Sequence, residues 1–411
     1  MYVHPKFTLA ALGLMAMGSV AHADNLYYIA EEAQDGTPLK WTAGLNGIWD
    51  DNPAPTAIGP GSGDSSFAVN PYLGVATVMV SPQTTIDIYG RLGVTYYADA
   101  PDALGDDTFY QARVGFNVTH RVNERLRLSS RNFVAYELEP DYSYGFATAR
   151  QNGEYLFYSS DQSVGYRWTD RLGTYTGFRF TGLDYDAANN DRNSWEFYQS
   201  FRYQVSPQTV AIAEYRYNNT TGDGLASDST GHFLLVGAEH RLSPNAVAIV
   251  RAGAQLRDVD GGDSTSSPYL EGALQSRINT QLSVRGFIRY GIEDYDTVQF
   301  VPTEVEAVEY SDRRVTRLGV SADYALSQAV TLFSGVDYIH ADFQEGRTTV
   351  SNLPVGFEPS EDLVNLYVGF SYKVTPVFSV NGSYNYTDSI SDIASREYDR
   401  NRVSLGVSAE F

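Results

Sequence analysis

The chain has 411 residues with 29 basic and 50 acidic side chains, and its formal net charge of −21 disfavours a nucleic-acid partner. It contains no cysteine, which excludes a small disulfide-stapled domain. Its 31 tyrosines and 20 phenylalanines recur in short alternating runs, and aromatic residues are enriched in β-strands.

The first 23 residues have the order of a secretory signal peptide. A weakly basic start with Lys6 precedes an apolar run over 7–18, and small residues follow up to Ala23. We expect cleavage before Asp24, which leaves 24–38 as a short periplasmic segment. The apolar run is shorter than the roughly 20 residues that a spanning helix needs, and no later stretch is long enough. The sequence therefore predicts export and no transmembrane helix.

Short turn signals recur along the rest of the chain. Pro, Asn, Asp or Ser lies at the centre of each, where it presets or tolerates the dihedral angles of a tight reversal. The eight centres are residues 82, 123, 170, 207, 244, 279, 327 and 376. Nine longer polar segments alternate with them, at 51–65, 99–107, 139–152, 184–193, 218–229, 258–264, 294–309, 343–360 and 388–398. Together these connections predict about 18 strands.

The predicted strands show the two-residue alternation of a barrel wall. In the last one, Val403, Leu405 and Val407 alternate with polar or small residues, so one face suits lipid and the other suits water. We predict an all-β fold, a transmembrane antiparallel β-barrel over 39–411 with short periplasmic turns and long extracellular loops. Near 233–256 both faces are apolar, and the register there stays open. A soluble β-helix or sandwich fits less well, because aromatic residues recur in strand after strand.

The C-terminal sequence resembles that of a known family. The chain ends in Phe411 after apolar residues at alternate positions, which resembles the strand that outer-membrane proteins present to the barrel-assembly machinery. The run 398–407 is similar to the end of the putative β-barrel porin-2 family. The resemblance implies the outer membrane of a Gram-negative bacterium, with lipid and the assembly machinery as partners. Some members accompany exopolysaccharide export, so it also implies polysaccharide or export components as partners.

Arginines on the strands are expected to face the lumen. Their planar, always-charged guanidinium groups can hold carboxylates, phosphates or sugar hydroxyls. The candidate pore-lining residues are Arg91, Arg113, Arg127, Arg131, Arg167, Arg179, Arg202, Arg216, Arg251, Arg285, Arg289, Arg317 and Arg402. Nine acids share these faces: Asp87, Glu137, Glu196, Glu214, Glu239, Glu293, Asp323, Asp337 and Glu410. The alternative is structural, with each Arg paired to an acid across neighbouring strands.

The expected extracellular loops are rich in carboxylates. The candidate residues are Asp99, Asp102, Asp106, Asp107, Asp184, Asp186, Asp191, Glu304, Glu306 and Glu309. They predict an acidic outer mouth before an arginine-lined throat, with a merely solvated surface as the alternative. No calcium loop, cysteine-based metal site, nucleotide-binding motif or catalytic triad spacing is present, so we predict no cofactor, no metal site and no enzymatic activity. Binding of a divalent cation by Asp102, Asp106 and Asp107 is the alternative for one acidic cluster.

Three functions are open at this point. The resemblance favours an outer-membrane conduit for hydrophilic material, as the barrel of an exopolysaccharide export system. The second is a general diffusion porin for small solutes, and the third is a structural or adhesive barrel whose acidic loops bind a partner. Eighteen strands enclose a lumen wide enough for water and solutes, and the segment before the first strand is too short to form a plug domain. Passage across the outer membrane is therefore the prediction.

Overall fold

The computed structural model describes residues 36–55, 63–140, 142, 153–186, 190–225, 227–262, 264–294 and 296–411. The expected signal peptide, 1–23, and nearly all of the expected periplasmic segment, 24–38, lie outside these residues. Within the described ranges no helix is long and apolar enough to cross a bilayer.

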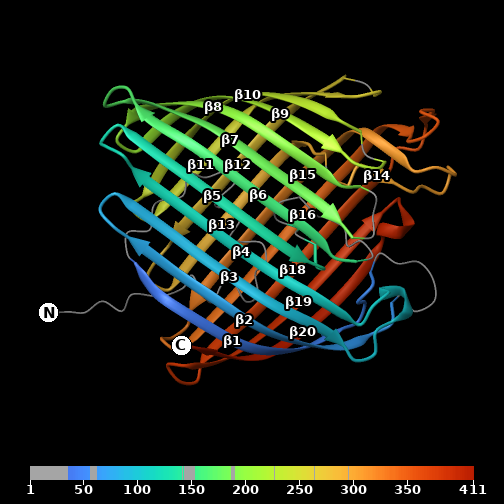
Figure 1. Cartoon of the computed structure of the whole chain (residues 1–411), viewed down its shortest axis with the longest axis horizontal. Helices are drawn as coiled ribbons and strands as arrows, with labels where there is room; N and C mark the ends of the chain where they lie inside the picture. Colours follow the sequence, from blue (N-terminus) through green and yellow to red (C-terminus); the bar gives the residue numbers. More distant parts are fainter. Residues whose placement is uncertain are drawn as a thin grey trace.

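The described chain forms one antiparallel sheet that closes on itself (Figure 1). Its long strands are β1 (Thr37–Asp50), β2 (Ser66–Val80), β3 (Thr84–Tyr97), β4 (Thr108–Arg121), β5 (Leu126–Glu137), β6 (Tyr155–Arg167), β7 (Leu172–Tyr185), β8 (Arg192–Ser206), β9 (Thr209–Gly222), β10 (Ser229–Ser243), β11 (Ala246–Val259), β12 (Ser264–Arg277), β13 (Leu282–Ile292), β15 (Val308–Ala325), β16 (Val330–Thr348), β18 (Ser360–Lys373), β19 (Phe378–Ser391) and β20 (Tyr398–Glu410). Short strands β14 (Val298–Gln299) and β17 (Pro354–Val355) pair with the ends of β15 and β16.

The barrel is closed by pairing between its first and last strands. Thr42 pairs with Glu410 and Asp50 with Arg402, in an unbroken antiparallel register. Beyond this ladder, the backbone N–H of Phe411 donates to the Trp41 carbonyl at 2.8 Å, and the Trp41 N–H donates back at 3.0 Å. Phe411 thus lies at the closing seam, although its role as an assembly signal stays a prediction. Closure leaves no open edge among the long strands of the described ranges, as a membrane requires.

The predicted hairpin rhythm is confirmed. Each of the eight turn centres falls in a tight connection between long strands, and eight of the nine polar segments contain a longer loop. The exception is 258–264, because β11 continues to Val259 and β12 begins at Ser264, which leaves a connection as short as the tight turns. The C-terminus lies at the end that carries the tight turns, here called the inner end, and the long loops lie at the opposite, outer end (Figure 1). The barrel begins at Thr37, two residues before the expected position 39. The expected loop 343–360 is shorter than predicted, because β16 continues to Thr348 against β15.

Apolar side chains cover the outer surface of the barrel. In β20, Val403, Leu405 and Val407 are 44%, 61% and 55% exposed, and they point outward as predicted. Trp41 and Trp49 do the same on β1. An alternating pattern therefore becomes a lipid-facing wall, because each side chain on a strand points to the opposite side from its neighbours.

The register near 233–256 is resolved by contacts inside the lumen. Phe233 and Leu235 of β10 point inward and pack with Tyr269 of β12. Ile249 of β11 packs inward against Ile212 of β9. Both faces of these strands are apolar because this part of the inner wall has small apolar clusters of its own.

Two larger apolar clusters lie near the outer end. One joins Ile48, Tyr97 and Phe109 to Leu104 of the short helix η2 (Asp102–Leu104). The other joins Tyr310, Ile339, Phe343 and Leu363 to Ile393, beside the short helix η3 (Ala394–Arg396), and Tyr142 packs against it. Long loops therefore fold back onto the barrel and pack there.

Candidate functional site

The inner wall holds most of the predicted arginines in ion pairs with acids, most of which come from another strand or a loop. Their partners are Glu137 for Arg113; Asp161 and Glu196 for Arg179; Glu239 for Arg202; Glu214 and Glu271 for Arg216 and Arg251; Asp323 for Arg285; Glu293 for Arg289 and Arg317; and Asp50 and Glu139 for Arg402. The structural alternative thus accounts for these arginines. Asp50, Asp161, Glu139 and Glu271 complete the pairs and are absent from the acids that the sequence pattern assigns to the lumen.

One ion-pair cluster spans β9, β11 and β12. The Arg216 guanidinium donates to Glu271 at 2.7 Å and to Glu214 at 2.5 Å, and Arg251 donates to Glu271 at 2.6 Å. All four side chains are buried, and Tyr269 donates a further hydrogen bond to Glu271 at 2.7 Å. Charges removed from water to this degree are stable only when each has a partner, so this cluster fixes the wall.

A second cluster surrounds Glu293, directly after β13. Its carboxylate accepts hydrogen bonds of 2.7 Å from both Nε and Nη2 of Arg317, in the forked geometry that suits guanidinium and carboxylate. Arg289 and Arg313 each lie 3.5 Å from the same carboxylate. Three arginines therefore share this carboxylate, and Asp296 is a second negative charge close to Arg313.

The described start of the loop that follows β5, residues 138–140 and 142, reaches into the lumen. The backbone carbonyl of Tyr142 accepts a hydrogen bond of 3.1 Å from Arg317 of β15, a strand on the opposite side of the barrel. The Tyr142 hydroxyl also lies 3.0 Å from that of Tyr398, and Glu139 accepts a hydrogen bond of 2.6 Å from Arg400 of β20. This loop therefore narrows the outer half of the lumen.

The connection between β13 and β15 folds inward from another side. The side chain of Asp296 accepts a hydrogen bond of 2.9 Å from the Tyr185 hydroxyl of β7. Asp294 pairs with Arg257 of β11 at 2.5 Å, and Thr297 accepts a hydrogen bond of 2.6 Å from Arg192 of β8. Since Tyr185 and Arg192 lie on strands well away from β13 around the barrel, this second loop further reduces the outer opening.

The predicted acidic loop residues take different places. Asp99, Asp102, Asp106, Asp107, Asp186 and Glu304 are exposed at the outer end, and Asp184, Asp191 and Glu306 are partly exposed. Glu309 corrects the expectation: it belongs to β15, is buried, and pairs with Arg192 at 3.3 Å. It also accepts a hydrogen bond of 3.0 Å from the Ser227 backbone. Its partners, on β8 and in the loop between β9 and β10, explain why this acid is buried.

The remaining predicted arginines lie on β3, β5 and β6. Arg91 donates to Asn70 at 3.2 Å and lies 4.1 Å from the ring centroid of Tyr72. Arg131 is opposite Asp161 in the register of β5 and β6. Arg127 and Arg167 lie at the inner end, where they line a cavity.

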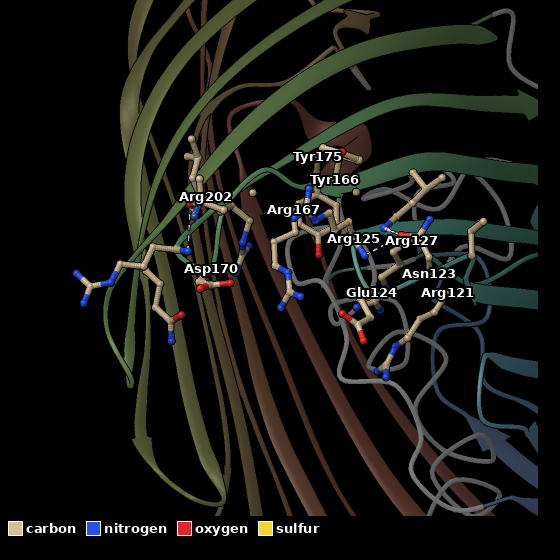
Figure 2. A pocket seen from close by; sticks show the side chains of 18 of the residues that line it. Arg121, Asn123, Glu124, Arg125, Arg127, Tyr166, Arg167, Asp170, Tyr175 and Arg202 are labelled. Carbon is tan, nitrogen blue, oxygen red and sulfur yellow. Dashed lines mark hydrogen bonds between the residues drawn. The ribbon is translucent and has the colours of Figure 1, made fainter.

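This cavity has a volume of about 950 Å³ and lies at the inner end of the barrel (Figure 2). We call it the basic cavity. Residues of β4 to β9 and of the turns after β2, β4 and β6 line it. Six of its lining residues are arginines and two are acids, so the lining itself has a formal excess of four positive charges, of which Arg202 is paired with Glu239 outside it. These charged lining residues are Arg121, Arg125, Arg127, Arg167, Arg171, Arg202, Glu124 and Asp170.

Half of these arginines were missed because they lie in the tight turns or at the strand end next to one. Arg125 and Arg171 belong to tight turns, and Arg121 is the last residue of β4. The sequence does contain a signal for them, because each lies within two residues of a turn centre, at residue 123 or 170. Tight turns at one end of a barrel bring such residues together. Among the described residues there is no group of three or more His, Asp or Glu side chains able to hold a metal ion.

Comparisons with known proteins concern the whole barrel. The sequence profile of the family described as "Putative beta-barrel porin 2" matches residues 45–411. The curated proteins gave no match. Among solved structures, the outer membrane protein opdK from Pseudomonas aeruginosa is similar at 12% identity and a TM-score of 0.44, over 91% of this chain and 99% of that chain. Acinetobacter baumannii OccAB3 is similar at 9% identity and a TM-score of 0.46, over 91% and 100%. Similarities at this level carry no argument about solutes.

Proposed function

Because the chain belongs to the putative beta-barrel porin 2 family, we propose that it is a diffusion channel for small hydrophilic solutes with a preference for anions. A porin-type barrel of this family implies the outer membrane of a Gram-negative bacterium. The basic cavity carries the proposal, since its excess positive charge lies where the lumen opens at the inner end. Arginine attracts carboxylates and phosphates without losing its charge at any physiological pH.

We favour diffusion over export of exopolysaccharide because of the inward loops. Hydrogen bonds hold Tyr142 and Asp296 to strands on other sides of the barrel, so the outer half of the lumen is narrowed. A bulky polymer would have to pass through this narrowed part. Deletion of the gene would separate the two functions. Diffusion predicts slower uptake of small anions with polysaccharide secretion unchanged, whereas export predicts the reverse.

Planar-bilayer recording tests the proposal directly. We expect a steady ionic current and a reversal potential in a KCl gradient that indicates chloride preference. Replacing Arg167 and Arg171 by Ala should lower the chloride-to-potassium permeability ratio roughly twofold or more, because the cavity field weakens. Arg277→Ala is the matched control, since Arg277 lies at the inner end of β12 and outside the cavity lining.

Two results would count against the channel. A barrel that passes no current would favour a structural or adhesive role, in which the acidic loops bind a partner outside. A conducting barrel whose selectivity responds equally to Arg277→Ala and to the cavity variant would show that the basic cavity does not set ion preference.

A further inference from the structure

The outer surface of the barrel contains a polar patch on four neighbouring strands. The patch consists of Ser130, Asn132, Ser160, Gln162, Thr176 and Gln199, from β5, β6, β7 and β8. Their outward direction follows from the strand pleat: Val134 and Val164, two residues from Asn132 and Gln162, are each 44% exposed, and Phe197 and Phe201 flank Gln199 at 40% and 52%.

The patch lies at mid-height on the lipid-facing wall. Asn132, Gln162 and Gln199 are each at least five residues from both ends of their strands. No other strand in the described ranges carries an outward Asn or Gln that far from both ends. Polar side chains at this depth are unfavourable against hydrocarbon, so surrounding lipid does not explain three of them together.

Hydrogen bonds within the patch satisfy Asn132 but not the two glutamines. Asn132 accepts from Ser160 at 2.9 Å and from Gln162 at 3.2 Å, and it donates to Ser130 at 3.0 Å. Gln162 Nε2 also donates to Ser160 at 2.9 Å, and Gln199 Oε1 accepts from Thr176 at 2.6 Å. Within the described chain, Gln162 Oε1 and Gln199 Nε2 make no hydrogen bond.

We propose that this patch is the contact surface between two copies of the barrel in the membrane. The unused groups are one acceptor and one donor, separated by β7. A two-fold rotation about an axis near Phe178 places each opposite its complement on the second copy, so the same surface serves both partners. The exposed rings of Phe178, Phe197 and Phe201 surround these amides and supply apolar contact area. A partner of different sequence would need its own matching amides, whereas a second copy already has them.

Cysteine cross-linking in native outer membranes tests the proposal, because the natural chain has no cysteine. Phe178→Cys places one thiol beside the proposed axis, and oxidation should give a disulfide-linked homodimer. Val368→Cys is the matched control: Val368 is equally mid-strand and 52% exposed, but lies on β18 at the opposite side of the barrel. It should give no dimer.

A second variant tests the amides themselves. Gln162→Leu combined with Gln199→Leu should weaken dimerisation in detergent at least tenfold, while the barrel folds as judged by heat-modifiable electrophoretic mobility. Ser334→Leu, on the outward face of β16, should leave dimerisation unchanged. Absence of a dimer from Phe178→Cys, equal cross-linking of the Val368 control, or a cross-linked product with another protein would each overturn the proposal.

Discussion

Glu293 lies among three arginines on the lumen wall, and its contacts make it a test of the structural role of these charges. Both the acid and Arg317 are buried, at 3% and 1% exposure. Removing one partner of such a group leaves buried charges uncompensated. We expect Glu293→Gln to lower the free energy of unfolding by about 3–5 kcal/mol, measured by urea titration in lipid vesicles. Glu304→Gln should change it by less than about 0.5 kcal/mol, because Glu304 is exposed.

For these buried charges, the sequence predicts which side chains face the lumen but not how they pair. Alternation within a strand places Arg317 and Arg402 on the inward face, because it depends only on nearby residues. It does not tell which acid each arginine meets, since Glu139 and Glu293 come from connections after strands and reach Arg402 and Arg317 only in the closed barrel. The clustering of Arg121, Arg125 and Arg171 is likewise a property of adjacent turns.

The elements were predicted well where they follow local rules. Turn residues and two-residue alternation gave the number of strands and the end at which each connection lies. The destinations of the loops were not predictable, because the β5–β6 loop meets Arg317 some 175 positions later in the chain. The length of β16 was underestimated for a similar reason: its last residues are strand only because β15 pairs with them.

The β5–β6 loop also gives a prediction at the scale of one element. Tyr142→Ala removes the hydroxyl contact with Tyr398 and the packing against the outer apolar cluster, so the loop should be held less firmly across the lumen. We expect single-channel conductance to rise, by roughly 1.5-fold or more, if this loop limits the opening. Tyr136→Phe is the control, because the Tyr136 hydroxyl bonds Asp186 at 2.6 Å at the outer end. An unchanged conductance in Tyr142→Ala would mean that the constriction lies elsewhere.

At the scale of the whole molecule, opposite charges lie at the two ends of one passage. The long loops carry many carboxylates and, apart from Arg150 and Arg396, no basic residue, whereas the basic cavity lies at the inner end. This order follows from the topology: tight turns with Arg125 and Arg171 gather at one end, and acidic loops gather at the other. Ions crossing the barrel therefore meet two fields of opposite sign in succession.

A passage charged in this way should conduct asymmetrically. When the outer side is positive, cations enter through the acidic end and anions through the basic end, so both accumulate in the lumen and the current is larger. With the voltage reversed, each end repels the ions that would enter there and the current falls. The Debye length shortens from about 10 Å at 0.1 M salt to about 3 Å at 1 M, so the asymmetry should be clear at 0.1 M KCl and nearly absent at 1 M. Current–voltage curves of barrels inserted in one orientation measure it. Symmetric curves at 0.1 M KCl would mean that the loop carboxylates are too far from the ion path to act on it.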